Sequence, residues 1–378
     1  MNNKLIALLL SSALTLGACS SATKKVVRDD SASSMLPGKY STVKAVGNYH
    51  ASRLTGDYAG YKSTRKFIGK MERQYGFERS YLNGLFSQAE RRNGVLRIMN
   101  RYTGVKGPVS RGAWSRYRKK FLTENHISKG AAFWARNRLA LQRAEQQYGV
   151  PAEYIVAIIG VETIYGGNVG RSPVFDSIAT IAFDYPRRSK YFTDELEQYL
   201  LMSREERFDP RTKRGSYAGA MGLGQFMPSS FRKYAVDFNG DGKRNLWTPT
   251  DAIGSVANYF QSYGWRRGEG VVVRATHSGN AYKAMESGFD SSHSLGSLKR
   301  AGVRASGQVS SRNVSLLRYS TYSGDELWLG KHNFYVITRY NHSNRYAMAV
   351  HQLAQAVKRR YRSMRYAYQG SAAEGGEG

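Results

Sequence analysis

Apolar residues recur with the period of an α-helix along most of this sequence. The first such stripe begins near Thr64, and the side chains on its face are Phe67, Ile68, Met71 and Tyr75. Gly76 follows at the position where a left-handed residue commonly ends a helix. The pattern therefore predicts an amphipathic helix that ends at Gly76.

A second long helix is expected between Ser128, whose hydroxyl can cap it, and Gly149. Its apolar stripe comprises Phe133, Trp134, Leu141 and Tyr148. Pro151 then suits the first turn of a following helix, because the N–H that proline lacks has no helical partner there. Both helices end in similar segments, residues 72–76 and 145–149, which we interpret as a recurring helix–glycine–helix corner and not as a domain repeat.

After Trp265 the pattern changes to short β-prone runs separated by Gly and Ser. These runs are residues 271–273, 316–319, 326–329 and 334–337. A final amphipathic helix follows, whose apolar side consists of Tyr346, Val350, Leu353 and Val357. The expected fold class is therefore mainly α, an α+β arrangement in which a small β-rich unit lies late in the sequence.

The N-terminus carries a short apolar run that starts at Leu5, directly after Lys4. The run is too short to cross a bilayer easily, and a charged start followed by such a run is typical of a signal peptide. It ends in Leu-Gly-Ala-Cys at residues 16–19, which resembles the lipobox of bacterial lipoproteins. That resemblance implies a signal peptide at 1–18 and a lipid on Cys19, the only cysteine of the chain. The plain alternative is a small buried cysteine at the edge of an apolar run.

Residues 19–47 begin with a polar, Ser-rich segment that cannot pack a core, so we expect a flexible tether. The Gly/Ala/Glu-rich tail, residues 367–378, is expected to be disordered. Ser20, where some lipoproteins have Asp, favours the outer membrane by resemblance to known sorting rules. We therefore expect a lipid-anchored protein on the periplasmic face of the outer membrane. One cysteine allows no disulfide framework, so stability must come from packing or from a metal.

Basic residues strongly outnumber acidic ones. The chain has 57 Lys+Arg against 28 Asp+Glu, a formal net charge of +29. Such a charge attracts polyanions, and nucleic acid is the usual first hypothesis. The sequence contains no helix-turn-helix, zinc-finger or RNP pattern, and the export signal argues against nucleic acid as a partner. Our hypothesis is that the basic surface attracts anionic components of the envelope.

Residues 155–161 are apolar on every face of a helix and lead directly into Glu162. A helix of that kind is buried in a protein core. A carboxyl in apolar surroundings resists ionisation, which is what a general acid needs to protonate a leaving oxygen near neutral pH. The pattern therefore indicates Glu162 as a catalytic acid. The alternative is a glutamate at a helix end that points into solvent.

Residues 219–230 begin with three glycines in six positions, followed by Gln225, Phe226 and Met227. Glycine lets a backbone approach a ligand or another helix closely. Gln225 offers a donor and acceptors to a sugar, and the two apolar residues can form a wall. Alone, the segment could equally be a tight packing turn. It is not a phosphate-binding loop, because no Lys-Ser/Thr follows at the required spacing.

Oxygen-bearing side chains between residues 237 and 251 have the spacing of the opening half of an EF-hand loop. The predicted ligands are Asp237, Asn239, Asp241, the Lys243 carbonyl and Asp251. Thr248 stands where an EF-hand has its closing glutamate, so Asp251 would close the loop late. We expect a structural Ca²⁺ here. The alternatives are an Asp/Asn/Gly turn without metal, and a capping box at 248–251 that starts the next helix.

Taken together, these segments resemble the lytic murein transglycosylases, specifically the membrane-bound B type. The stretches that carry the likeness are residues 158–163, 183–188, 216–230, 234–260, 338–342 and 346–350, within a similarity over roughly residues 50–365. The resemblance implies a lysozyme-like catalytic core at 151–265 and 331–366, an additional helical domain at 48–150 and a small β-rich domain at 266–330. The late-closing metal loop also resembles that of this family.

Carried over residue by residue, the resemblance makes Glu162 the single catalytic acid/base. The positions that would bind glycan strands of peptidoglycan are Tyr117, Arg187, Arg188, Ser216, Met221, Gln225, Phe226, Tyr259, Tyr340, Asn341 and Tyr346. The family mechanism implies that Glu162 protonates the oxygen between MurNAc and GlcNAc and later takes the proton of the C6 hydroxyl. The substrate's acetamido group stabilises the sugar cation between these steps. The product is a 1,6-anhydro end, and neither water nor a catalytic cofactor is consumed.

Two other functions stay open from the sequence. A hydrolytic muramidase would use water in place of the C6 hydroxyl, and residue spacing does not separate the two. Most glycosidases need a second carboxylate, and only Asp184 and Asp209 offer one, neither in an apolar frame. The other alternative is a non-catalytic lipoprotein scaffold that grips glycan strands and recruits other cell-wall enzymes.

Overall fold

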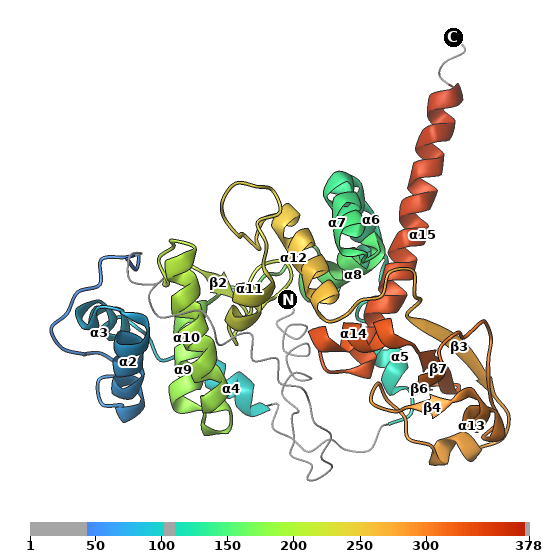
Figure 1. Cartoon of the computed structure of the whole chain (residues 1–378), viewed down its shortest axis with the longest axis horizontal. Coiled ribbons are helices and arrows are strands. Elements are labelled where there is room, and N and C mark those ends of the chain that lie inside the picture. The colour runs from blue at the N-terminus through green and yellow to red at the C-terminus, as the bar shows by residue number, and fades with distance from the viewer. Residues whose placement is uncertain (1–43, 102–109, 375–378) are drawn as a thin grey trace.

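The computed structural model describes residues 44–101 and 110–374, with side chains up to residue 365. The predicted signal peptide, Cys19 and nearly all of the predicted tether therefore lie outside the described residues. Across the described part the chain is mainly helical with a small β-rich part (Figure 1), which confirms the expected fold class. No helix in these ranges is both long enough and apolar enough to cross a membrane.

One half of the helical body joins the first helices of the chain to two later ones (Figure 1). Its members are α2 (Lys62–Tyr75), α3 (Arg79–Ser87), α4 (Asn93–Arg101), α9 (Val174–Asp184) and α10 (Ser189–Glu205). The ring of Phe183 on α9 lies 6.1 Å from the rings of both Phe67 on α2 and Phe86 on α3. The Tyr75 hydroxyl donates to Glu197 of α10 at 2.6 Å. Aromatic packing and buried hydrogen bonds thus hold the early helices against α9 and α10.

The other half surrounds α8 (Ala152–Thr163). The helices packed against α8 are α6 (Glu124–Arg136), α7 (Arg138–Tyr148), α12 (Pro249–Ser262) and α15 (Asn344–Glu374), and this half also contains α5 (Ala113–Arg118), α11 (Pro228–Tyr234) and α14 (His332–Tyr340). Every residue of α8 except Glu162 is buried. This is the expected outcome for a run that is apolar on all faces. The fold therefore encloses one helix and leaves Glu162 as its only partly exposed residue.

The β-rich part contains one antiparallel sheet with the strand order β4–β6–β7–β3–β5. The strands are β3 (Val272–His277), β4 (His293–Ser294), β5 (Val303–Ala305), β6 (Asn313–Thr321) and β7 (Gly324–Gly330), with α13 (Leu295–Arg300) between β4 and β5. β6 and β7 form a hairpin whose register pairs Leu317 with Trp328. Trp114 of α5 packs 4.8 Å from Tyr319 of β6, so α5 connects the sheet to the helical body.

The second predicted helix starts earlier than expected and is broken once. Thr123, not Ser128, is its cap, because Thr123 Oγ1 accepts from the His126 N–H at 3.2 Å. Ser128 lies inside α6, where its hydroxyl donates to the Glu124 carbonyl at 2.8 Å. At Asn137 the backbone leaves the helical conformation (φ −110°, ψ 24°), so the expected single helix is the pair α6 and α7.

Both glycine corners are confirmed. Gly76 and Gly149 are left-handed, with φ of 65° and 74°, and end α2 and α7. Pro151 is the cap of α8 and stands one residue before the expected position. The strand predicted at 334–337 is wrong, because these residues belong to α14. A short apolar run does not distinguish a buried strand from a buried helical turn, and here three of its four side chains are buried in a helix.

Packing crosses the predicted domain boundaries. α6 and α7, assigned to the helical domain 48–150, pack against α8, α12 and α15. α9 and α10, assigned to the core 151–265, pack with the early helices as well as with α11. The final helix is confirmed as α15, but it continues to Glu374, beyond residue 367 where a disordered tail was expected.

Candidate active site

Glu162 lies in the last turn of α8 and is partly buried. The hydroxyl of Tyr346, from α15, donates a hydrogen bond of 2.6 Å to Glu162 Oε1. Burial raises the pKa of Glu162 to about 7, and the Tyr346 hydrogen bond offsets part of this rise because it stabilises the carboxylate. Glu162 is therefore not a glutamate extended into solvent. Near neutral pH it can both donate and accept a proton.

Three phenol groups from three helices lie near this carboxyl. They belong to Tyr117 of α5, Tyr340 of α14 and Tyr346 of α15. Burial raises the pKa of each phenol, and the neighbouring charge of Glu162 raises it further. All three phenols therefore stay neutral and can offer hydroxyl groups without adding charge. The fold thus brings three of the predicted glycan-binding residues to the predicted acid.

α8 ends in a strained turn directly after the acid. Ile164 and Tyr165 both have left-handed backbone, with φ of 53° and 58°, which is unusual for a β-branched residue. The buried hydroxyl of Thr163 lies 3.0 Å from the carbonyl oxygen of Leu223 and so ties this turn to the glycine-rich segment. Thr163 is not among the residues predicted from the sequence. Its position directly after Glu162 could have identified it as a residue that shapes the site.

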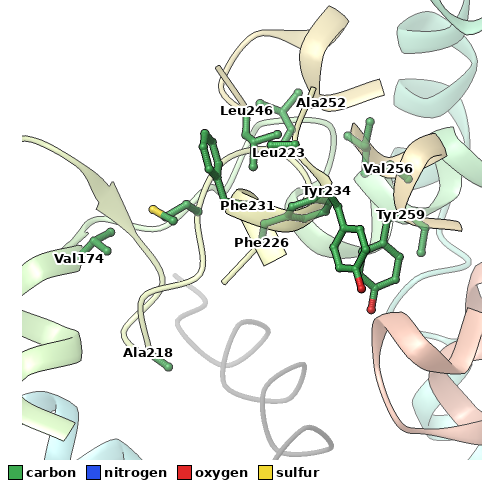
Figure 2. Close-up of a cluster of buried hydrophobic side chains, with 14 of the residues drawn as sticks. Val174, Ala218, Leu223, Phe226, Phe231, Tyr234, Leu246, Ala252, Val256 and Tyr259 are labelled. Atoms are coloured by element: carbon green, nitrogen blue, oxygen red, sulfur yellow. The ribbon is translucent and has the colours of Figure 1, made fainter. Parts of the chain in front are cut away.

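The glycine-rich segment folds into a tight turn. Met221 and Phe226 exchange two backbone hydrogen bonds of 2.9 and 3.0 Å. Gly222 has a φ of 68°, and a Cβ there would lie 2.4 Å from that of Leu246, so the turn requires glycine. Figure 2 shows Phe226, Leu223 and Leu246 in one apolar cluster. The predicted close backbone approach is thus present, and Phe226 packs into the core.

Two predicted ligand contacts are used by the protein itself. The Gln225 side-chain amide donates to the carbonyls of Gly222 at 3.0 Å and Val169 at 3.2 Å. Its donor end is therefore occupied, and Oε1 is the end that suits a sugar hydroxyl. Ser216 is buried, and its Oγ accepts from the Ala220 N–H at 3.0 Å. Both side chains shape the turn.

Tyr259 and Tyr340 belong to an aromatic cluster with Tyr234. The Tyr259 ring lies 4.8 Å from each of the other two, and Figure 2 shows Tyr234 and Tyr259 side by side. The Tyr340 hydroxyl donates to the Gly224 carbonyl at 2.5 Å, and the Tyr259 hydroxyl donates to the Arg339 carbonyl at 2.6 Å. Since Tyr259 is only 7% exposed, its ring mainly packs α12 against α14.

The other predicted residues lie at the edges of this arrangement. Arg187 and Arg188 form the short η3 (Pro186–Arg188) between α9 and α10. Within the described ranges, no hydrogen bond or ion pair joins either arginine to Glu162. Asn341 follows α14 and is buried. The structure therefore assembles Glu162 with the tyrosines and does not bring the arginine pair into contact with it.

Among the described residues, no second carboxylate shifts the pKa of Glu162. Asp184 accepts a hydrogen bond of 2.8 Å from Tyr61, and Asp209 accepts one of 2.7 Å from Tyr49. Both alternatives from the sequence thus make structural contacts between the early helices and later segments. Burial also raises the pKa of Glu195, but Ser229 donates to both of its carboxylate oxygens, whereas Glu162 lies among the predicted glycan-binding tyrosines.

The EF-hand-like segment is a compact loop held by its own carboxylates. Asp237 accepts from the Gly242 N–H at 2.7 Å. Asp251 is fully buried and accepts from the N–H groups of Phe238 at 2.9 Å and Asn245 at 2.8 Å, so it fastens both ends of the loop. The capping box is not formed, because the cap residue Thr248 donates its hydroxyl to the Asn245 carbonyl instead.

The side chains and carbonyl of this loop offer oxygen ligands, which suit a hard cation. Its ligands would be oxygens of Asp237, Asn239, Asp241, Asp251 and the Lys243 carbonyl, the kind that Ca²⁺ prefers. No three His, Cys, Asp or Glu side chains in the described ranges are gathered closely enough to hold a metal by themselves. An ion here would therefore depend on the amide and carbonyl oxygens as well as the carboxylates.

The chain is similar to known proteins in sequence and in fold. The family described as "Transglycosylase SLT domain" matches residues 60–355. The membrane-bound lytic murein transglycosylase B of Escherichia coli strain K12 is 49% identical over 314 residues, which cover 82% of this chain and 86% of that protein. The E. coli lytic transglycosylase Slt35, solved in complex with calcium, has a TM-score of 0.77 at 48% identity over 82% of this chain and 96% of its own. SltB3 of Pseudomonas aeruginosa, solved with NAG-anhNAM-pentapeptide, has a TM-score of 0.67 at 29% identity over 79% and 80%.

Proposed function

Because the chain belongs to the SLT-domain lytic murein transglycosylases, we propose that Glu162 is the single acid/base with which it cleaves the β-1,4 bond between MurNAc and GlcNAc. The observation that carries this proposal is the environment of the Glu162 carboxyl. It ends a helix that is otherwise fully buried, has a pKa of about 7 and receives a hydrogen bond from Tyr346. One carboxyl with that pKa can act first as acid and then as base near neutral pH.

The reaction has two steps. Protonated Glu162 gives its proton to the glycosidic oxygen as the bond breaks, while the acetamido group of MurNAc stabilises the positive charge at C1. Glu162 is then a carboxylate, and the Tyr346 hydrogen bond stabilises its charge. In the second step the carboxylate takes the proton of the C6 hydroxyl, whose oxygen attacks C1. The sugar gains a 1,6-anhydro end, and Glu162 returns to its protonated form without water.

The glycan strand is expected to lie along the tyrosines near Glu162. Tyr117 and Tyr340 offer neutral phenol rings near Glu162. Four buried members of the predicted set act through the shape of the glycine-rich turn; they are Ser216, Met221, Phe226 and Tyr259. Arg187 and Arg188 would meet carboxylates of the lactyl or peptide parts of the substrate. The fragment bound by SltB3 supports peptidoglycan as the ligand.

The chemical form of the product tests this function against the hydrolytic alternative. Purified enzyme incubated with sacculi should release fragments whose MurNAc ends are one water lighter than hydrolysed ends. Such ends have no free aldehyde, so borohydride should leave them unchanged. Fragments that borohydride reduces would instead identify a muramidase, and binding without any release would identify a scaffold.

We further infer that the loop at 237–251 binds a structural Ca²⁺, an inference supported by the oxygen donor set and by the calcium complex of Slt35. A ligand that binds only the folded state stabilises it by about 2.7 kcal/mol at a hundredfold excess over its Kd. Saturating Ca²⁺ should therefore raise the melting temperature relative to EGTA. Asp241→Ala should abolish that gain, and Glu162→Gln should retain it. Superimposable melts in Ca²⁺ and EGTA would rule out a stabilising calcium site.

We also infer that Cys19 carries the lipid that holds the protein at the periplasmic face of the outer membrane. The relative named as membrane-bound supports a membrane location. Each buried CH₂ of an acyl chain contributes about 0.8 kcal/mol, so several chains anchor a protein firmly. Cys19→Ala should therefore move the protein from the membrane fraction to the soluble fraction. Equal membrane retention of both forms, with no lipid mass on Cys19, would refute this anchor.

A further inference from the structure

A hollow that the proposed reaction does not use lies beside α5. It is an open hollow of about 430 Å³ between the segment before α5, the short η4 (Ala281–Ala284) and the β6–β7 hairpin. Its lining is polar and includes Arg111, Lys283, Asp325, Ser320, Thr321 and Ser323. A hollow of this size suits a small ligand or a short peptide.

Three charged side chains line this hollow without neutralising one another. Arg111 and Lys283 are exposed, and neither forms an ion pair within the described residues. The Asp325 carboxylate accepts a hydrogen bond of 3.1 Å from Tyr282 and likewise has no ion pair within the described part of the chain. The hollow therefore offers two cations and one carboxylate to an incoming molecule. Its complement is a ligand that carries both carboxylates and an ammonium group.

The hollow is formed in advance by hydrogen bonds of its own walls. Arg111 Nε donates to the Tyr322 carbonyl at 2.9 Å, which fastens the hairpin tip to the segment before α5. At the tip, the Thr321 hydroxyl donates to the Gly324 carbonyl at 2.7 Å. Groups held in this way lose little freedom when they bind a ligand.

The position of the hollow relates it to Glu162. Arg111 stands two residues before α5, and α5 packs against α15, whose Tyr346 hydroxyl donates to Glu162. At 1.5 Å per residue, the six residues of α5 span about 9 Å. An extended peptide spans about 3.3–3.6 Å per residue, so about three residues cover that distance.

We propose that this hollow binds the peptide stem attached to MurNAc of the strand being cleaved. Arg111 and Lys283 bind the stem carboxylates, and Asp325 binds the free ammonium group of its diamino acid. This site extends the proposed function, since it rests on a glycan strand lying at Glu162. A phosphate would satisfy the two cations but would be repelled by Asp325, so the mixed charge favours a peptide.

The test compares two substrates and three variants. The substrates are glycan strands with stems and strands from which an amidase has removed the stems. Lys283→Ala and Asp325→Asn should each lower kcat/KM on the strands with stems by about tenfold, the value of a charged hydrogen bond. Both variants should cleave the bare strands like the wild type. Lys299→Ala, an exposed lysine of α13 outside the hollow, should leave both substrates unaffected.

Equal losses on both substrates, or no loss on either, would overturn the stem site. A binding titration tests the stem site independently of the catalytic role of Glu162. Free tetrapeptide stem should bind to Glu162→Gln protein, and the additional change Lys283→Ala should abolish the binding. Failure of the wild type to cleave either substrate would contradict the proposed function but not this titration. Inorganic phosphate that binds in place of the stem peptide would show a general anion site and overturn the assignment.

Discussion

Glu162→Gln should lower the rate of glycan cleavage by at least about 10³-fold, within the range of general acid–base catalysis. Glutamine keeps the shape of the side chain, and its oxygen can still accept the Tyr346 hydrogen bond. It cannot give a proton to the glycosidic oxygen, and it cannot take one from the C6 hydroxyl. Because both steps use the same carboxyl, no residual path through one step is available. Release of soluble fragments from sacculi measures the loss, and co-sedimentation with sacculi should show unchanged binding.

Glu153→Gln is the matched control for this variant. Glu153 lies on the same helix, is buried, and accepts from Lys358 Nζ at 2.6 Å. The same chemical change there removes a structural ion pair far from the tyrosines of the site. It should lower the melting temperature and leave cleavage close to that of the wild type. Substantial cleavage by Glu162→Gln, or an equal loss in both variants, would remove Glu162 from its role.

Tyr346→Phe should lower kcat by about 10- to 100-fold, because a hydrogen bond to a charged group is worth about 1.5–3 kcal/mol. It should also move the pH profile in a defined direction. The first step needs protonated Glu162, so the rate falls as pH rises through the Glu162 pKa of about 7. The Tyr346 hydrogen bond stabilises the carboxylate and lowers that pKa. Its loss should shift the alkaline limb of the profile to higher pH.

Tyr340→Phe separates this effect from a general loss of packing. The Tyr340 hydroxyl donates to the Gly224 carbonyl and not to Glu162. Its removal should weaken the glycine-rich turn and change the rate, but it should leave the alkaline limb in place. If the alkaline limb of the pH profile stays in place in Tyr346→Phe, or shifts equally in both variants, the 2.6 Å hydrogen bond from Tyr346 does not lower the pKa of Glu162.

The burial of Glu162 was predictable because its cause is local. Seven consecutive apolar residues precede it, and a helix apolar on all faces has no stable place except the core. The hydrogen-bond partner of Glu162 could not be predicted from the sequence pattern, because Tyr346 is 184 residues away in the sequence. The resemblance to a family supplied Tyr346 as a substrate residue, whereas the structure gives it a hydrogen bond to the acid.

The errors in predicting the fold have physical causes as well. Thr123 and Ser128 are both good caps, and the choice depends on where the chain leaves the preceding turn. The run at 334–337 has β-prone residues, but its surroundings make it helical. Packing crosses the predicted domain boundary at 150, because it depends on which apolar faces meet, and α9 meets α2 through Phe183.

The most direct test of the account is cleavage of sacculi in water enriched in ¹⁸O. If the Glu162 carboxylate activates the C6 hydroxyl of the substrate, no solvent oxygen enters the new ends. Mass spectra of the released fragments should then show 1,6-anhydro MurNAc ends without ¹⁸O. New ends that each carry one ¹⁸O atom would show that water attacks C1, and would contradict the account.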